Sequence, residues 1–128
     1  KAARFMKLGT NNRATLVGMM AGLKFLKDLG PENVYARIHE LAKYNDRLAR
    51  QRSYMEVLSS ADESLYGALT CIGFKGADLA PMWKKLRSRR IWTIITERVR
   101  ISTHIHTRKR DLEEFHATAD EVFGAKQG

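Results

Sequence analysis

The stretch from Arg98 to Phe115 constrains the fold more than any other part of the chain, because its periodicity changes within a few residues. Apolar and polar residues alternate over 99–106, which is the period of a strand with one buried face. Over 108–123 the apolar residues recur instead at helical spacing. They are Leu112, Phe115, Ala119 and Val122. The sequence therefore predicts a strand, a short turn and an amphipathic helix in direct succession.

The rest of the chain extends this pattern to the order α-α-β-β-α-β-β-α. Asn12 suits the N-cap of a helix over 13–29, and Gly30-Pro31 separates that helix from a second one over 31–51. The other predicted elements are strands at 54–58 and 65–74, a helix with Asp78 as its N-cap, and strands at 91–96 and 99–106.

This order indicates an α+β fold. We expect a small, mostly antiparallel sheet with helices packed on one face, preceded by a long linking helix. A length of 128 residues suits one domain with a single core. The chain is therefore divided into a linker segment, residues 1–12, which holds a Gly-Thr turn, and a small domain, residues 13–128.

The positive charge is concentrated in one window. Residues 84–110 hold ten basic side chains and one acidic side chain, so this window alone accounts for the net charge of +9. Such a surface favours an anionic partner, and a basic domain that binds nucleic acid or an acidic protein is an alternative hypothesis. Nucleic acid is disfavoured, because aromatic residues are not interleaved with the cations to stack on bases.

Several classes of protein are disfavoured by what the sequence lacks. No run of about 18 apolar residues occurs, so no membrane-spanning helix is expected. The first residues, Lys-Ala-Ala-Arg, lack a Met and the layout of a signal peptide, which is typical of a fragment or a processed chain. Nothing indicates a cellular compartment. The single cysteine, Cys71, leaves no internal disulfide and no cysteine cluster for a metal.

The predicted strand over 99–106 places four polar side chains on one face: Arg100, Ser102, His104 and His106. A guanidinium flanked by a hydroxyl and imidazoles suits a carboxylate, which arginine binds through two parallel hydrogen bonds. The same pattern is typical of a surface arginine paired with an acidic side chain, so the residues alone leave both interpretations open. The two histidines fall short of the three or four ligands that zinc needs, so no metal site is expected.

A second candidate lies at Gly9 and Thr10, just before the first predicted helix. A glycine turn at a helix N-terminus offers backbone N–H groups and a hydroxyl to a phosphate. An ordinary N-capping turn has the same appearance.

Two passages, in order, resemble the class V aminotransferase-like enzymes, which depend on pyridoxal 5′-phosphate (PLP) and have fold type I. RFMKLGTNN, residues 4–12, is similar to the R-F-E-x-G-T-x-N segment that links their large and small domains. RVRISTHIHTRKRDLEEF, residues 98–115, is similar to R-[IV]-S-x-H-x-x-T-x-x-D-[IL] near their C-terminus. The helical residues after Thr15 also resemble that family, and the closest pattern is that of isopenicillin N epimerase-like proteins.

The resemblance implies the C-terminal small domain of an enzyme that acts on an amino acid as an epimerase or aminotransferase. It implies that Arg100 binds the substrate carboxylate, with Ser102 and His104 beside it. It also implies that Gly9 and Thr10 contact the cofactor phosphate, commonly across a homodimer interface. The partners implied are an amino-acid substrate and a large PLP-binding domain.

The chain also departs from the family in three ways. The lysine that forms the Schiff base belongs to the large domain, so no catalytic residue is expected in this chain and the fragment alone is expected to be inactive. The loop that carries the nucleophilic cysteine of cysteine desulfurases is missing before Arg100, which disfavours that activity. Arg108-Lys109-Arg110 replaces the family's usual residues with three cations at a helix start, where they oppose the helix dipole.

Overall fold

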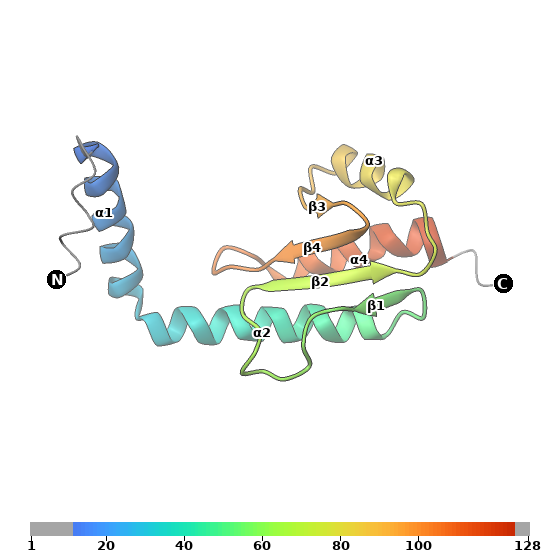
Figure 1. The fold of residues 1–128 in the computed structure, drawn as a ribbon, viewed down its shortest axis with the longest axis horizontal. Helices are drawn as coiled ribbons and strands as arrows, with labels where there is room; N and C mark the ends of the chain where they lie inside the picture. Colours follow the sequence, from blue (N-terminus) through green and yellow to red (C-terminus); the bar gives the residue numbers. More distant parts are fainter. Residues whose placement is uncertain (1–11, 125–128) are drawn as a thin grey trace. The chain divides into compact units, whose positions relative to one another are not determined.

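The computed structural model describes residues 12–124, and the predicted order of elements is confirmed (Figure 1). The helices are α1 (Arg13–Leu29), α2 (Pro31–Arg50), α3 (Ala80–Ser88) and α4 (Lys109–Phe123). The strands are β1 (Met55–Val57), β2 (Leu69–Phe74), β3 (Ile94–Ile95) and β4 (Arg98–Ser102). The chain forms two compact units, residues 1–34 and 35–128. No helix within residues 12–124 combines the length and the apolar character needed to span a bilayer.

In the first unit, α1 begins and ends as the sequence predicts. The Asn12 side chain accepts a hydrogen bond from the Thr15 backbone N–H at 3.2 Å, which confirms it as the N-cap. Gly30 ends the helix with φ of 82°, a left-handed conformation that favours glycine. The helix carries many apolar residues, yet none of its residues is buried within the described part of the chain. Its large exposed apolar residues are Leu16, Val17, Met19, Met20, Leu23, Phe25 and Leu29.

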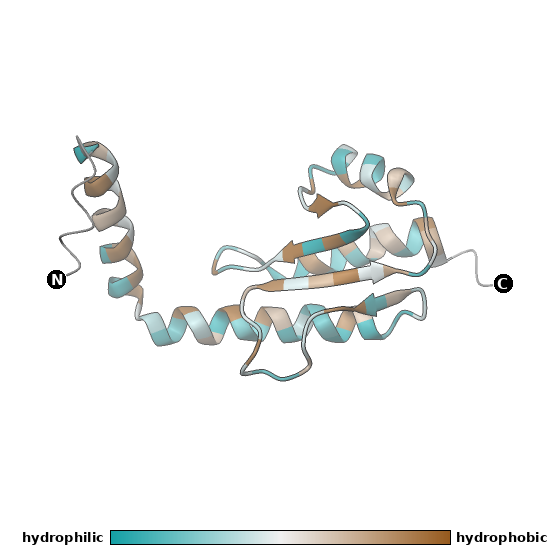
Figure 2. Cartoon of the chain, viewed as in Figure 1, coloured by the Kyte–Doolittle hydropathy of each residue, from teal (hydrophilic) through white to brown (hydrophobic). Residues whose placement is uncertain are grey.

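The second unit is built on a four-stranded antiparallel sheet of order β1-β2-β4-β3. Hydropathy alternates along β4 in Figure 2, because Val99 and Ile101 are buried while Arg98, Arg100 and Ser102 are exposed. In Figure 1, α2 and α4 lie behind the sheet, which agrees with the predicted helical layer on one face. The core of this unit contains Leu41, Ile72, Phe74, Met82, Leu86, Val99, Ile101, Leu112, Phe115 and Ala119.

The strands are shorter than predicted. β2 begins at Leu69 rather than at residue 65, and β3 contains two residues rather than six. β4 ends at Ser102, so the prediction that His104 and His106 lie on this strand was wrong. The reason is local: both the backbone N–H and the hydroxyl of Thr103 donate to the Ala68 carbonyl, at 2.8 and 3.1 Å, and the chain then turns.

Two other expectations at helix ends differ by a few residues. The N-cap of α3 is Leu79 rather than Asp78, although the Asp78 carboxylate accepts the Ala80 N–H at 2.9 Å. The last helix starts at Lys109, one residue after the predicted start at residue 108. Such shifts follow from side-chain bonds that the pattern of apolar residues does not specify.

A partly buried polar cluster joins α2, α4 and the segment before β1. Arg52 forms two hydrogen bonds with the Asp120 carboxylate, at 2.8 and 2.6 Å, and the Tyr54 hydroxyl donates to the same group at 2.5 Å. Nearby, His116 Nε2 lies 2.9 Å from Asn45 Oδ1, and both residues are fully buried. Because an amide oxygen only accepts, neutral His116 donates through Nε2.

We predict that this histidine makes the fold sensitive to acid. Burial, assisted by the nearby Arg52 cation, lowers the pKa of His116 to about 4. The unfolded chain binds a proton near pH 6.5 and the folded chain does not, so stability is complete above that pH and falls towards pH 4. Urea unfolding should show a loss of about 2 kcal/mol between pH 7.5 and 5 from this group.

The control is the exposed His106. H106N should keep the full dependence on pH, whereas H116Q should lose most of it while being less stable at pH 7.5. An unchanged pH dependence in H116Q would contradict the assignment.

Candidate functional site

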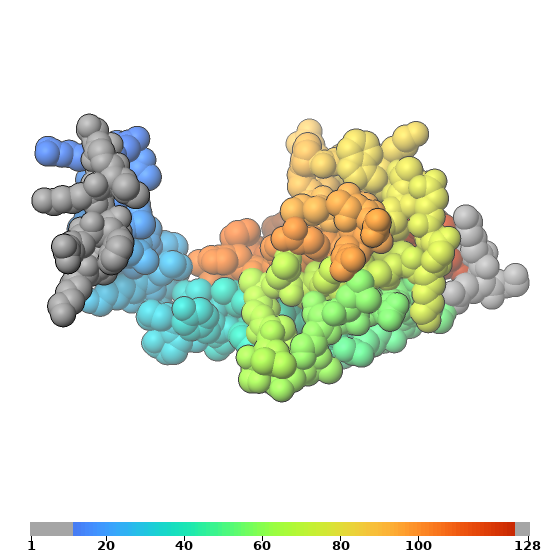
Figure 3. All heavy atoms as spheres, in the orientation of Figure 1, coloured from blue at the N-terminus to red at the C-terminus, as the bar shows by residue number. Residues whose placement is uncertain are grey.

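Arg100 and Ser102 lie on the open face of the sheet, opposite the helical layer. The strand register pairs Arg100 with Cys71 of β2 and with Ile94 of β3, and it pairs Ser102 with Leu69. Residues directly opposite in an antiparallel pair point to the same face, so the cross-strand neighbours of Arg100 on this face are uncharged, while Arg98 lies on the same face two residues away. In Figure 3, the orange atoms of the β3–β4 region lie at the surface of the face shown.

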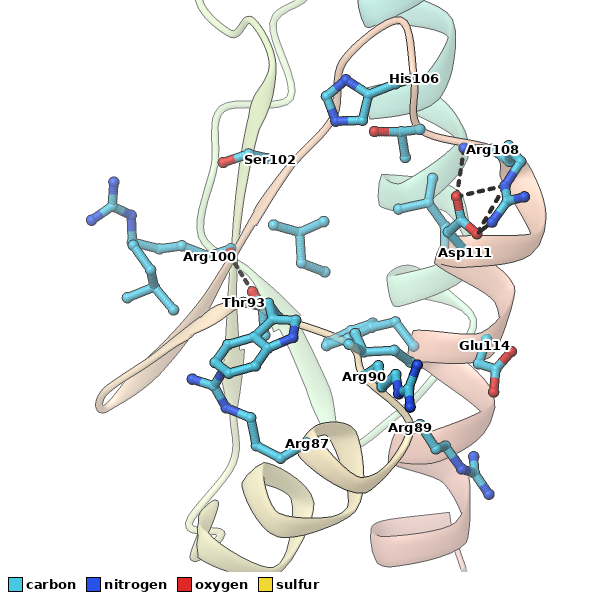
Figure 4. A pocket seen from close by; sticks show the side chains of 17 residues that line it. Arg87, Arg89, Arg90, Thr93, Arg100, Ser102, His106, Arg108, Asp111 and Glu114 are labelled. Atoms are coloured by element: carbon cyan, nitrogen blue, oxygen red, sulfur yellow. Dashed lines mark hydrogen bonds and ion pairs between the residues drawn. The ribbon is translucent and has the colours of Figure 1, made fainter.

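The guanidinium of Arg100 forms no ion pair with any residue between 12 and 124. Figure 4 shows its side chain extending away from α4, while its backbone carbonyl accepts a hydrogen bond from the Thr93 hydroxyl. The interpretation of Arg100 as one half of a surface ion pair is therefore not supported. A guanidinium without an ion pair on this exposed face is suited to bind a carboxylate from another molecule.

A cleft of about 1000 Å³ lies on the other side of β4 (Figure 4). It runs between β4 and α4, with residues 87–94 at one end and the turn 106–108 at the other. Its floor is apolar and includes Ile101, Leu112 and Phe115, whereas its rim carries arginines together with the acids Asp111 and Glu114. Arg100 and Ser102 are also among the residues that line the cleft, so it adjoins the open face of the sheet.

The two histidines lie together in the turn rather than in a row along the strand. Their ring centroids are 5.4 Å apart and the rings are stacked at 30°. The Thr107 N–H donates to the His104 carbonyl at 2.9 Å, and the His104 N–H donates to the Thr107 hydroxyl at 3.0 Å, which closes the turn. Within the described residues no group of three or more His, Cys, Asp or Glu side chains is placed to hold a metal ion.

The three cations at the start of α4 are largely accounted for by acids of this chain. The Asp111 carboxylate accepts the Arg108 backbone N–H at 2.9 Å and forms an ion pair with its guanidinium at 2.7 Å. That guanidinium holds the pKa of the Asp111 carboxyl below its usual range. Lys109 pairs with Glu40 of α2 at 2.7 Å. Asp111 therefore places an acidic group where the helix dipole favours it, which offsets the unfavourable cations.

The remaining predicted site residues, Gly9 and Thr10, lie outside the described residues. Conversely, the sequence indicated the basic residues 84–90 only as part of the positively charged window 84–110 and placed none of them in a cleft. The structure brings Arg87, Arg90 and Trp92 to the rim of the cleft. One signal was present, since the helix ends in Ser-Arg-Arg without the usual glycine.

The fold is similar to that of segments of solved PLP-enzyme structures. The cysteine desulfurase CsdA from Escherichia coli is 18% identical with a TM-score of 0.79, over 93% of this chain and 32% of that one. The cysteine desulfurase of Thermococcus onnurineus is 16% identical with a TM-score of 0.80, over 91% and 32%. The cystine C-S lyase C-DES is 19% identical with a TM-score of 0.72, over 89% and 31%.

These similarities show a shared fold. The chain spans about a third of the length of these proteins. A variant of C-DES has been solved with glycine covalently linked to its PLP cofactor. A scan of protein-family models and a search of curated proteins both find no match.

We predict that Asp111 is the main determinant of how stably α4 begins. D111A removes the acceptor of the Arg108 N–H and leaves three cations at a helix N-terminus. The loss should be about 1 kcal/mol in the free energy of unfolding, measured by urea denaturation at neutral pH. E114A changes a nearby acid of the same helix that has no ion pair within residues 12–124, and it should stay within about 0.5 kcal/mol. Equal effects of the two substitutions would refute the role of Asp111.

Proposed function

We propose that this chain is the small domain of a PLP-dependent enzyme that acts on an amino acid, and that Arg100 binds the carboxylate of the substrate. The observation that carries this proposal is the position of Arg100. It lies at the motif position of the resemblance, on the open face of the sheet, without an acidic partner among the described residues, in a fold shared with segments of PLP enzymes.

The described residues fit the substrate end of such a site. Arg100 supplies a bidentate cation and Ser102 a hydroxyl on the same face, while the cross-strand neighbours Ile94 and Cys71 carry no charge. Gly9 and Thr10 are proposed to contact the cofactor phosphate. When bound, PLP supplies an electron sink for negative charge at the substrate Cα. The contribution of this chain is to fix the orientation of the substrate through its carboxylate.

His104 requires a revised role. Its ring is stacked on His106 in the turn that follows β4, and its backbone N–H is held by Thr107. We propose that it positions this turn beside Ser102 rather than binding the carboxylate as a member of the strand.

The exposed surface of α1 supports a larger assembly. An apolar helix with no buried residue in the described chain is unfavourable in water, because a contiguous apolar surface of this kind normally contacts a partner. We propose that a large PLP-binding domain, and a second subunit in a homodimer, cover it. The length of the solved proteins with this fold is consistent with such a domain.

Among possible reactions we propose epimerisation or transamination. β3 and β4 are joined by Thr96 and Glu97 alone, so no long loop precedes Arg100. Cys71 lies within β2, where its backbone N–H donates to the Ser59 hydroxyl at 2.9 Å. A cysteine held in the middle of a sheet lacks the freedom to deliver a thiolate to a substrate, which argues against desulfurase chemistry despite the shared fold.

The alternative of a basic domain for nucleic acid or an acidic protein has less support. Four of the ten basic side chains of the window, Lys85, Arg89, Arg108 and Lys109, form ion pairs with acids of this chain. Their charge is partly neutralised, so less of the window is available to phosphates.

The test is the substitution R100Q in the enzyme that contains this domain and its PLP lysine. The affinity for the amino acid should fall about 10- to 100-fold, because a bidentate charge-assisted contact is lost. The cofactor absorbance should be unchanged. A titration of that absorbance with amino acid measures both quantities.

R98Q is the matched control, since Arg98 is exposed on the same face of the same strand two residues away. It should leave affinity for the amino acid unchanged. If R100Q binds the amino acid as the parent does, the carboxylate role is wrong. If the parent enzyme shows no PLP absorbance, the whole proposed function is wrong.

A further inference from the structure

Arg90 has a backbone conformation that an arginine rarely adopts. Its φ is 59°, and it is the one non-glycine residue with positive φ in the described chain. It follows the end of α3, where the Ile91 N–H bonds to the Leu86 carbonyl at 2.9 Å and the Arg90 N–H to the Arg87 carbonyl at 3.0 Å. These two bonds define a Schellman motif, whose left-handed position is normally glycine. The chain therefore carries a strained arginine where glycine would be more stable.

The strain places the Arg90 side chain at the cleft between β4 and α4. Figure 4 shows it between the strand and the helix. Its guanidinium forms no ion pair with any residue from 12 to 124. The adjacent Arg89, by contrast, is held by the Thr118 hydroxyl at 2.7 Å and by the Glu121 carboxylate at 2.8 Å. Of the two arginines that follow α3, Arg89 is held by a hydrogen bond and an ion pair, whereas Arg90 has no ion pair among the described residues.

A second arginine that lines the cleft, Arg87, also forms no ion pair with any residue from 12 to 124. The Arg87 guanidinium lies between two indole rings, 3.5 Å from the centroid of Trp92 and 5.1 Å from that of Trp83. Its Nη1 is buried and has no hydrogen-bond partner. The aromatic faces hold this charge in place while leaving it electrostatically unneutralised. Trp92 is 76% exposed, so one face of this arrangement is accessible from solvent.

The cleft thus combines two unneutralised guanidinium groups with an apolar floor. Ile101, Leu112 and Phe115 supply the floor, and the volume of about 1000 Å³ admits a small organic molecule. Arg100 and Ser102 also line this cleft, although the Arg100 side chain extends away from α4, so the cleft adjoins the carboxylate site proposed above.

We propose that the cleft is a second binding site, for a small organic anion with an aromatic or branched apolar body. The anionic group binds at Arg90, while Arg87 on the far side of Trp92 adds positive charge, and the apolar body lies on Ile101, Leu112 and Phe115. The left-handed Arg90 is retained for this contact at the expense of helix-end stability. The site does not require PLP or a large domain.

The experiment uses the 128-residue chain, labelled with ¹⁵N, and 1-naphthoate as the probe. The chain has two tryptophans, so the indole N–H signals report on Trp92 and Trp83 separately. Naphthoate should shift the Trp92 signal in a saturable manner, whereas neutral 1-naphthalenemethanol should shift it at least 10-fold more weakly. The neutral analogue also controls for apolar binding to α1. Equal binding of the two compounds would overturn the proposal.

R90G separates binding from folding. Glycine suits the left-handed position, so Tm should rise by about 4 °C, while affinity for naphthoate should fall about 10-fold or more. R90K should keep part of the affinity. K75Q, which removes an exposed cation away from the cleft, should leave the affinity unchanged. If R90G binds naphthoate as tightly as the parent, Arg90 does not hold the anion and the proposal is wrong.

Discussion

The second unit depends on the burial of Val99 and Ile101 of β4 against the helical layer. These two side chains lie in the same core as Leu112, Phe115 and Ala119 of α4, and every other residue of the strand is exposed. Because the side-chain period of a strand is two, a register slip of one residue would exchange the buried and exposed sets. Packing of two aliphatic residues therefore decides which face Arg100 occupies.

This dependence explains how much the sequence alone predicts. The alternation at Val99 and Ile101 and the helical spacing of Leu112 and Phe115 are both consequences of burial, so they are visible as patterns. The ends of the elements are set by polar bonds instead. The double hydrogen bond from Thr103 to Ala68 ends β4 four residues earlier than predicted. No periodicity records a bond between residues 35 positions apart.

The candidate site, like the fold, was only partly predictable from the sequence. The sequence could not predict that Arg100 lacks an ion pair, because its residues also allowed one. Only the fold shows that Arg100 forms none with residues 12–124. The positions of Arg90 and Trp92 at a cleft depend on how α3 ends, and the arginine in a Schellman motif contradicts the local preference for glycine. Places where a chain departs from its local preference are often those where a side chain has a function.

Most basic residues of the window 84–110, which accounts for the net charge of +9, fall into three groups in the folded chain. Lys85, Arg89, Arg108 and Lys109 are partners of internal acids and support the ends of α3 and α4. Arg98 and Arg100 belong to the open face of the sheet. Composition treats these cations as equivalent, whereas the fold distinguishes them by the acid each one does or does not meet.

Arg87 and Arg90 form a third group, the cations at the cleft, which adjoins the carboxylate site. Ile101 points into the cleft, whereas the side chain of Arg100, one residue earlier, extends away from α4 although Arg100 also lines the cleft. A substitution at Arg90 changes the end of α3 and the cleft but leaves the register of β4 intact, because that register is fixed by pairing with β2. Loss of anion binding in R90G and loss of carboxylate binding in R100Q are therefore measured on different guanidinium groups.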